Sequence, residues 1–381
     1  MKALVLAGGG AKGSYQVGVW RALEELGWKP DIITGTSVGS LNGALFTLGL
    51  SDVARDMWLS IDTDDIITLP DRLTPGELHD FLRDVVKGGG LDVTPLEQII
   101  DRLLDEDALR ASSIRFGLVT VERSKENGIR PRELSVDEIP EGKVKDYLLA
   151  SAACFPAFRP RQIDGAKFYD GGYADNLPFG LAKRMGAGEL LCVDIDGLGI
   201  KKLNFSGLPT KTIESHWDLG ELLKFDPTVA RRNIELGYYD TLRAFGRVQG
   251  TAYAIRLGDE QTAALADFSA RYDAVLDRIT EEAPALALTA LTAVQLFGPA
   301  KDQRLLAPLE LAAEQAGVDP TRLYTVQQLC DAFAAAYDPE QADRYRKVLA
   351  GEEKAGAEAV FAAVTPRDFV AAVVYTALTE K

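Results

Sequence analysis

Histidine is nearly absent from this chain, whose 381 residues include only His79 and His216. Cysteine is almost as scarce, and Cys154, Cys192 and Cys330 are far apart and form no C-x-x-C pair. These absences argue against a disulfide framework and against a zinc site built from histidine and cysteine. We expect three small buried cysteine side chains and no zinc site.

Positive charge is also in short supply. The 42 Lys and Arg residues face 57 Asp and Glu residues, which gives a formal net charge of −15. Nucleic-acid binding needs a basic face, so no nucleic-acid partner is expected. The charge balance likewise gives no general attraction to an anionic membrane surface.

Long apolar runs are missing as well. Residues 1–7 are too short an apolar run for a signal peptide. The stretch Ala283–Phe297 is shorter than the about 20 residues that a membrane span needs, and Ala357–Leu378 is broken by a Pro-Arg-Asp triplet. We expect a soluble, cytoplasmic protein, and peripheral contact with a membrane stays open.

The first 45 residues alternate between strand and helix patterns. The apolar run Ala3–Ala7 ends in glycines and predicts a strand buried on both faces. Residues 14–26 predict a helix, 32–34 a second strand and 38–48 a second helix. This order is typical of an α/β fold with a parallel sheet.

Later segments continue this pattern and then change character. Further elements are expected as strands at 114–121, 167–169, 190–195 and, last in the sheet, Tyr253–Leu257, and as helices at 144–153 and 178–186. From about Asp259 the chain is rich in alanine and leucine, which predicts several antiparallel helices. The expected domains are residues 1–258 and 259–381.

The segment Gly35-Thr36-Ser37-Val38-Gly39 is a G-x-S-x-G pattern between a predicted strand and a predicted helix. Such a pattern places a serine on a strained turn, and its glycines let neighbouring backbone pass without a clash with Cβ. The N-terminus of the following helix favours negative charge that develops at the serine. Ser37 is the candidate nucleophile, and Gly35 and Gly39 support its turn.

The segment Gly8-Gly9-Gly10-Ala11-Lys12-Gly13 follows the first strand. It is either a tight strand–helix turn or a cluster of N–H groups that face an anion. In the second interpretation the oxyanion hole consists of Gly8, Gly9, Gly10, Lys12 and Gly13.

The same loop also fits the G-x-G-x-x-G pattern, so a dinucleotide-binding enzyme that uses Gly8–Gly13 is a competing interpretation. That fingerprint places an acidic residue at the end of the second strand. Asp31 instead precedes this strand, and Gly35 follows it. The pattern therefore favours an oxyanion loop over a dinucleotide site.

The segment Asp170-Gly171-Gly172 follows a short predicted strand and by itself indicates a turn. A serine nucleophile needs a base, and histidine is the usual one. Here His79 lies in a helical pattern with acidic neighbours, and His216 lies in a polar stretch that matches no strand end. If neither histidine serves, a carboxylate must, and Asp170 is the candidate on a loop, next to Gly171 and Gly172.

A conventional triad is the alternative. The order Ser37, Asp170, His216 matches the chain order in α/β-hydrolases. In that fold, however, several strands precede the nucleophile turn, whereas only one precedes it here. A surface position for His216 is the favoured interpretation.

The three motifs in this order resemble the patatin-like phospholipase family. The segments Asn176-Leu177-Pro178 and 150–156 also resemble the blocks that flank its motifs. The resemblance covers roughly Met1 to Ile195. It implies a three-layer α/β/α sandwich of patatin type with a mostly parallel central sheet, here followed by a C-terminal all-helical region.

The resemblance also implies a Ser37–Asp170 dyad that works through an acyl-enzyme without histidine, cofactor or metal. The expected function is a serine acyl hydrolase of the lipase, phospholipase A or lysophospholipase type, acting on lipid acyl esters. A catalytically inactive lipid-binding or scaffold protein on the same fold stays open as the alternative. The sequence does not predict the oligomeric state.

Overall fold

The computed structural model describes residues 1–66, 90–126, 128–204, 206–256, 258–297, 305–345, 349–350 and 362–380. The chain divides into two compact units, Met1–Ala244 and Phe245–Lys381. The division expected between residues 258 and 259, as the limit of a catalytic domain, stays a prediction.

The N-terminal unit alternates strands and helices. Its strands are β1 (Lys2–Leu6), β2 (Ile32–Thr36), β3 (Arg115–Ser124), β4 (Gly128–Ser135), β5 (Arg161–Ile163), β6 (Ala166–Asp170), β7 (Glu189–Asp194) and β8 (Thr210–Glu214). Its α-helices are α1 (Ser14–Glu25), α2 (Val38–Thr47), α3 (Ser51–Trp58), α5 (Thr94–Leu103), α6 (Glu106–Ala111), α7 (Val144–Ser151), α8 (Phe179–Arg184) and α9 (Pro227–Ala244). Single 3₁₀ turns are η1 (Gly10–Gly13), η2 (Thr63–Asp65), η3 (Val136–Glu138) and η4 (Gly171–Tyr173).

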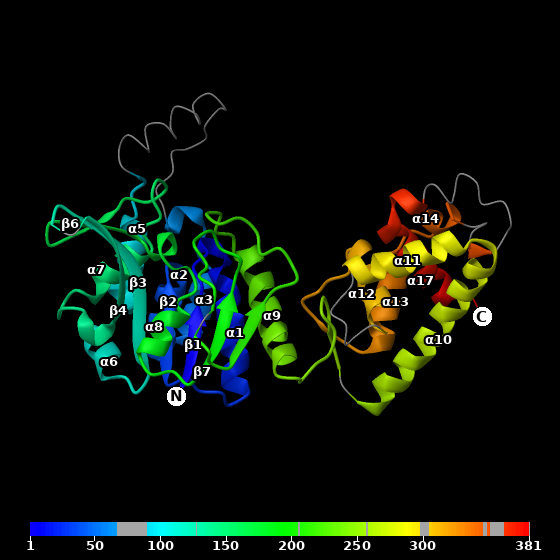
Figure 1. The fold of residues 1–381 in the computed structure, drawn as a ribbon, viewed down its shortest axis with the longest axis horizontal. Helices are drawn as coiled ribbons and strands as arrows, with labels where there is room; N and C mark the ends of the chain where they lie inside the picture. Colours follow the sequence, from blue (N-terminus) through cyan, green and yellow to red (C-terminus); the bar gives the residue numbers. More distant parts are fainter. Residues whose placement is uncertain are drawn as a thin grey trace, which may run out of the picture. The chain divides into compact units, whose positions relative to one another are not determined.

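The described strands of this unit form one eight-stranded sheet in the order β5-β6-β3-β2-β1-β7-β8, with β4 paired to β3 (Figure 1). Strands β3, β2, β1, β7 and β8 run parallel. Strands β4 and β6 are antiparallel to β3, and β5 is antiparallel to β6. The expected mostly parallel central sheet is confirmed.

Helices cover both faces of the sheet. On one face, α8 shares a core cluster with Ala3 and Val5 of β1. Side chains alternate along a strand, so Leu6 points to the face opposite to that of Ala3 and Val5. On that face it packs against α2, because a Cβ added to Gly43 of α2 would lie 3.5 Å from Leu6 Cδ1. The three-layer α/β/α arrangement is confirmed.

One edge of the sheet is β8, and the expectation that Tyr253–Leu257 forms the last strand of the sheet is wrong. Residues 254–255 form β9 (Ala254–Ile255), which pairs with β10 (Leu323–Tyr324) in a separate two-stranded sheet of the C-terminal unit. Strand β8 escaped prediction because four of its five residues are exposed, so it lacks the apolar run of a buried strand.

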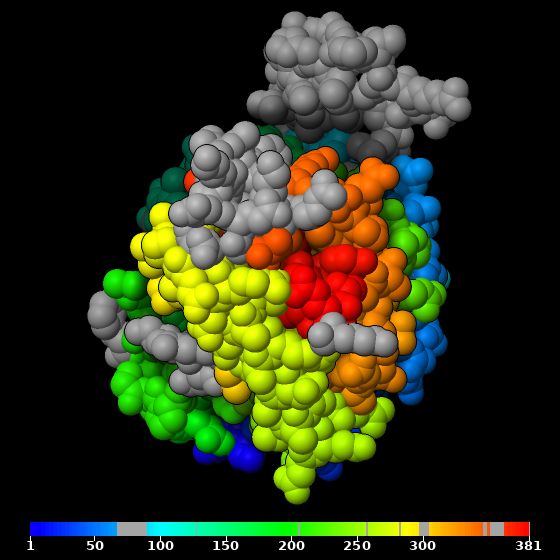
Figure 2. Space-filling model, turned by 90° about the vertical axis from the view of Figure 1, so that its right-hand side faces the viewer, coloured from blue at the N-terminus to red at the C-terminus, as the bar shows by residue number. Residues whose placement is uncertain are grey.

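The described residues of the C-terminal unit are mainly helical, as expected, and β9 and β10 add only two residues each. Its α-helices with given bounds are α10 (Asp259–Glu282), α11 (Pro284–Phe297), α12 (Ala307–Gln315), α13 (Val326–Ala336), α14 (Pro339–Asp343) and α17 (Pro366–Thr379). Helix α17 is the core of this unit: its residues 369–374 are fully buried, and it contacts α10, α11 and α12. Figure 2 shows the part of the C-terminal segment that reaches the surface, in red between yellow and orange segments. Within the described ranges, no helix combines the length and apolarity needed to cross a membrane.

Candidate active site

The register of the sheet brings Ser37 and Asp170 together. Strand β2 pairs in parallel with β3, with Thr36 opposite Val119. Strand β6 pairs with the other side of β3, with Asp170 opposite Thr120. Ser37 directly follows Thr36, so the serine and the aspartate lie at the same level on the two sides of β3, although they are 133 positions apart in the sequence.

Ser37 occupies a strained turn between β2 and α2. Its φ of 55° and ψ of −127° lie in a region that side chains other than glycine rarely adopt. Its N–H donates to Ser151 Oγ at 3.0 Å, and its carbonyl accepts from Ser40 Oγ at 2.7 Å. Ser151 in turn donates to the carbonyl of Val119 at 2.7 Å. The surrounding fold therefore holds the strained conformation in place.

The glycines of the turn are required by close backbone approach. A Cβ on Gly35 would lie 2.2 Å from the carbonyl oxygen of Gly39, and one on Gly39 would lie 2.4 Å from that of Leu6. Real Cβ atoms do not approach an oxygen so closely, so α2 packs directly on the backbone of β1. This contact places Ser37 beside the glycine-rich loop that follows β1.

Asp170 ends β6 with a buried side chain. Its carboxylate accepts from the N–H of Gly172 at 2.7 Å and is hydrogen-bonded to the Ser37 side chain. Burial raises the pKa of Asp170 to about 6, against the opposing effect of these two hydrogen bonds. A Cβ on Gly171 would lie 2.2 Å from the carbonyl oxygen of Val119, so this glycine lets the loop after Asp170 pack against β3.

His216 is an exposed residue two positions beyond the end of β8. Three strand spacings, about 14 Å, separate β8 from β2. The polar hollow that His216 lines also contains Lys12 and Trp217 but neither Ser37 nor Asp170. Proximity therefore favours Asp170 over His216 as the partner of Ser37. His79 lies outside the described residues.

The glycine-rich loop lies against Ser37, and its N–H groups differ in their partners. Gly8 donates to the carbonyl of Asn176 at 3.2 Å, and Lys12 donates to that of Gly9 at 3.2 Å. Lys12 Nζ donates to the carbonyl of Asp196 at 3.0 Å. Among the described residues, the N–H groups of Gly9 and Gly10 have no such acceptor.

Two features single out Gly10 within this loop. Its φ is +52°, and an added Cβ would lie 2.0 Å from the carbonyl oxygen of Leu222, so only glycine fits. Gly10 and Val38 line the same cavity as Ser37. Val38 is the first residue of α2, where an N–H has no partner within the helix. Sequence reasoning did not include the Val38 N–H in the oxyanion site.

The other expected members of the oxyanion site have different neighbours. A Cβ on Gly13 would lie 2.5 Å from a methyl group of Val38, so Gly13 permits close packing of η1 on α2. The assignment of Gly8, Gly9, Gly10, Lys12 and Gly13 to an oxyanion hole stays a prediction. The end of β2 bears Thr36 and Ser37 and no carboxylate, which leaves the dinucleotide interpretation without its ribose-binding residue.

An apolar cavity opens beside Ser37. It holds about 820 Å³ of space, including open solvent at its mouth. It is lined mainly by aliphatic and aromatic side chains of α2, α3, α5 and α7 and by Phe158 and Phe225. The amide of Asn42 also lines it, but this amide already bonds to Gly13, Gln16 and Trp58. The cavity therefore suits an uncharged, apolar group.

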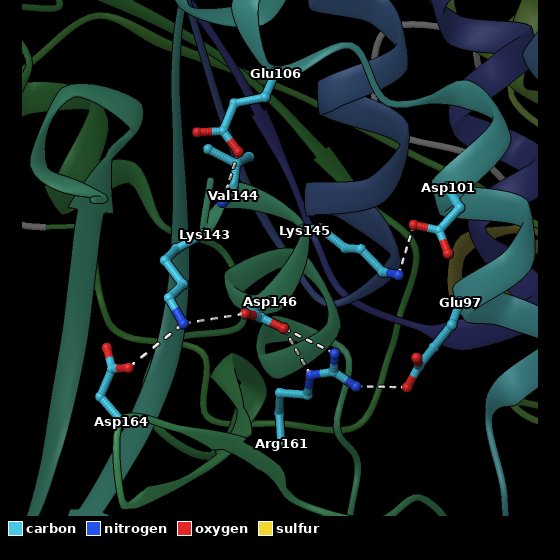
Figure 3. A network of polar contacts seen from close by, with 9 residues as sticks. All are labelled: Glu97, Asp101, Glu106, Lys143, Val144, Lys145, Asp146, Arg161 and Asp164. Carbon is cyan, nitrogen blue, oxygen red and sulfur yellow. Dashed lines mark hydrogen bonds and ion pairs between the residues drawn. The ribbon is translucent and has the colours of Figure 1, made fainter. Parts of the chain in front are cut away.

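Ion pairs hold α5, one wall of this cavity, to α7 and β5 (Figure 3). Arg161 contacts Glu97 of α5 at 2.5 Å and Asp146 of α7 at 2.7 Å. Lys145 of α7 contacts Asp101 of α5 at 2.6 Å. These side chains are part-exposed, so each ion pair contributes modestly to stability. The two ion pairs to α5 act together, however, because both hold the same helix.

Comparison with known proteins finds a family match for the segment that carries these residues. Residues 4–183 match the family model for patatin-like phospholipases. This segment is a patatin-like domain. The resemblance inferred from the three motifs is confirmed over these residues, and both Ser37 and Asp170 fall within the patatin-like domain.

Individual relatives match the same part of the chain. Patatin-like phospholipase domain-containing protein 7 of Rattus norvegicus is 30% identical over 201 residues, covering 51% of this chain and 13% of the relative. Lysophospholipase nte1 of Aspergillus terreus is 34% identical over 209 residues, covering 51% of this chain and 12% of the relative. The chain thus spans about an eighth of the length of these relatives. VipD from Legionella pneumophila aligns with 99% of this chain and 90% of its own at 14% identity, but the TM-score of 0.39 is too low to establish a shared fold.

The patatin-like domain contains two site residues whose roles sequence reasoning missed. Ser151 fixes the backbone of Ser37, and Asn176 contacts Gly8 through both its backbone and its side chain. Both lie in segments that the motif comparison had noted, at 150–156 and 176–178. No pattern within those segments indicates a partner, because each partner is more than 100 residues away.

The raised pKa of Asp170 predicts a pH-dependent stability change for Asp170→Asn. In the unfolded chain the carboxyl pKa is about 3.9, so burial costs stability once pH rises through the interval up to about 6. Asparagine keeps an acceptor for Gly172 but never ionises. We expect the variant to be more stable than wild type by at most about 3 kcal/mol at pH 8 and by only about 0.5 kcal/mol at pH 4, as measured by thermal unfolding.

A matched control is Asp196→Asn, because the Asp196 side chain is 94% exposed. Its effect on the unfolding temperature should not change in the same way between pH 4 and pH 8. An Asp170→Asn protein that is no more stable than wild type at pH 8 would contradict the raised pKa.

Proposed function

We propose that this protein is a serine acyl hydrolase that cleaves acyl esters of phospholipids or lysophospholipids. The observation that carries the proposal is a strained serine hydrogen-bonded to a buried carboxylate at the mouth of an apolar cavity. The relatives named above, a lysophospholipase among them, support the same class of substrate. Access to such lipids implies peripheral contact with a membrane or micelle, and this contact is part of the proposal.

In the first half of the reaction, Ser37 Oγ attacks the ester carbonyl carbon and transfers its proton to Asp170. A carboxylate with a pKa of about 6 is ionised at neutral pH and is a stronger base than an exposed aspartate. The N–H groups of Gly9, Gly10 and Val38 face the developing oxyanion, and one such donor contributes about 3–4 kcal/mol of transition-state stabilisation. Asp170 then protonates the departing alcohol oxygen, and the acyl group remains on Ser37.

In the second half, water attacks the acyl-Ser37 carbonyl and Asp170 takes the proton from this water. The tetrahedral intermediate collapses, the proton returns to Ser37 Oγ, and the fatty acid is released. The same carboxylate therefore accepts and donates one proton in each half-reaction. No residue other than Ser37 forms a covalent bond to substrate.

The acyl chain occupies the apolar cavity. Ser37, Leu41, Ala44, Leu45 and Leu48 line it at successive turns of α2. From Ser37 to Leu48 the helix rises about 16 Å, so the cavity follows the helix well beyond the reacting carbonyl. This length suits a long acyl chain better than an acetyl group.

The dyad predicts that hydrolysis needs no histidine. Ser37→Ala should abolish labelling by a fluorophosphonate probe and turnover of nitrophenyl butyrate. Asp170→Asn should lose nearly all turnover, because the amide keeps the volume but removes the base. The His79→Gln, His216→Gln double variant removes both histidines of the chain and should stay within about tenfold of wild type.

Activity that disappears in a folded His216→Gln variant would contradict the dyad and favour the Ser37, Asp170, His216 triad. A folded wild-type protein that neither reacts with the probe nor hydrolyses any acyl ester, yet binds lipid, would instead favour an inactive lipid-binding protein.

The cavity predicts that chain-length preference responds to Leu48. Leu48→Trp fills the end of the cavity farthest from Ser37 along α2, so kcat/KM for nitrophenyl palmitate should fall at least tenfold. Hydrolysis of nitrophenyl butyrate should change by less than about twofold, because a short chain does not reach this end. The control is Val53→Trp, since Val53 is 39% exposed and does not line the cavity. Equal losses for both esters would contradict acyl binding along α2.

A further inference from the structure

Asn176 connects the segment that carries Asp170 to the glycine-rich loop. The two residues are six positions apart on one stretch of chain. Asp170 reaches Ser37 from this stretch, and Asn176, which is 1% exposed, reaches Gly8. The same segment therefore holds the base and the loop whose Gly9 and Gly10 N–H groups lack an acceptor among the described residues.

Asn176 forms hydrogen bonds with both backbone polar groups of Gly8, its N–H and its carbonyl. The Gly8 N–H donates to the Asn176 carbonyl at 3.2 Å, and Asn176 Nδ2 donates to the Gly8 carbonyl at 3.1 Å. The Gly8 carbonyl and the Gly9 N–H belong to one planar trans peptide, in which they point in opposite directions. By fixing the carbonyl, the Asn176 side chain fixes the direction of the Gly9 N–H.

The orientation of the Asn176 amide follows from its neighbours. Nδ2 faces two carbonyl oxygens, those of Gly8 at 3.1 Å and Gly197 at 3.4 Å, and only the NH₂ group can donate to them. Oδ1 is buried and has no hydrogen-bond partner among the described residues. A Cβ added to Gly8 would lie 2.5 Å from this Oδ1 and 2.9 Å from Ser37 Cβ, so the Asn176 side chain lies beside the nucleophile.

The segment after β7 holds Asn176 in this position. The Asn176 N–H donates to the Ile200 carbonyl at 2.7 Å, and the Ile200 N–H donates to the Gly172 carbonyl at 2.8 Å. A Cβ on Gly199 would lie 2.9 Å from Asn176 Cβ, so the segment packs directly on the side chain. These contacts leave the amide little freedom to turn away from Gly8.

We propose that Asn176 is a positioning residue that aims the Gly9 N–H at the oxyanion formed on Ser37. This inference rests on the proposed acyl hydrolase function and adds a residue to it. Asn176 itself touches neither the substrate nor the proton that Asp170 carries. Its removal should therefore weaken stabilisation of the transition state while leaving substrate binding and the base unchanged.

The test compares Asn176→Ala and Asn176→Asp with wild type. Alanine removes the donor to Gly8, and aspartate sets an acceptor against two carbonyl oxygens. For nitrophenyl butyrate we expect kcat to fall about ten- to a hundredfold, less than or equal to the loss of a whole oxyanion donor, with KM within about threefold. The inhibition constant of a trifluoromethyl ketone, whose adduct with Ser37 carries an oxyanion, should rise by a similar factor. The pH midpoint of kcat/KM for Asn176→Ala should stay near that of wild type.

Asn233→Ala is the matched control. Asn233 is also fully buried, and its Nδ2 donates to the Leu219 carbonyl at 2.9 Å and to Ser14 Oγ at 3.4 Å. Its loss should lower the unfolding temperature as Asn176→Ala does, but kcat should stay within about threefold of wild type. This comparison separates loss of a buried amide from loss of loop orientation.

The inference is overturned if a folded Asn176 variant keeps wild-type kcat, if the ketone binds to it as tightly as to wild type, or if Asn233→Ala loses kcat equally. Failure of both Asn176 variants to fold also overturns it, because the role would then be structural. Wild type without Ser37-dependent hydrolysis would instead refute the proposed function itself and remove the basis of the inference.

Discussion

The candidate site depends on one buried contact, the hydrogen bond between the Asp170 carboxyl and Ser37. It forms because β3 lies between β2 and β6, so that its pairing with both strands brings their ends together. Burial of the carboxyl raises its pKa to about 6, and the proposed mechanism relies on this property for a base at neutral pH. A shift of either strand register by one residue would separate the two side chains.

Several unfavourable features accompany this contact at the same end of the sheet. They include the positive φ of Ser37, the buried ionisable side chain of Asp170, and the Oδ1 of Asn176, which has no partner in the described part of the chain. Each costs stability, and such costs persist where the surrounding structure fixes them. Here β1 and β2 are buried over nearly their whole length, and helices pack on both of their faces. This regular core supports the strained site.

The sequence predicted those strands and helices that have a continuous or periodic apolar pattern. Strands β1, β2 and β7 and helices α1, α2 and α7 lie close to their expected ranges, because each has a hydrophobic pattern that ends at glycine, proline or a polar turn. Strands β4 and β8 are mostly exposed and polar, so no such pattern marks them. The dipeptide Ala254–Ile255 looked like part of the sheet because a short apolar run does not reveal which partner it pairs with.

The candidate site likewise has residues that could be predicted from the sequence and residues that could not. The motifs around Ser37 and Asp170 were recognisable because the turn chemistry is local, with glycines at fixed offsets from the functional side chain. The anchoring roles of Ser151 and Asn176 depend on contacts between distant segments, as do the positions of the Gly9, Gly10 and Val38 N–H groups, for which the described part of the chain offers no acceptor. Such roles follow from strand register and loop packing, which a single sequence does not specify.

The central claim is that Asp170, and no histidine, activates Ser37. The most direct measurement is the second-order rate constant for fluorophosphonate labelling of Ser37 between pH 4 and pH 9, in wild type and in the histidine-free His79→Gln, His216→Gln variant. The account predicts one ionisation with a midpoint near pH 6 in both proteins, with labelling lost below it as Asp170 becomes protonated. A midpoint that disappears or moves by more than about one pH unit when the histidines are removed would contradict it.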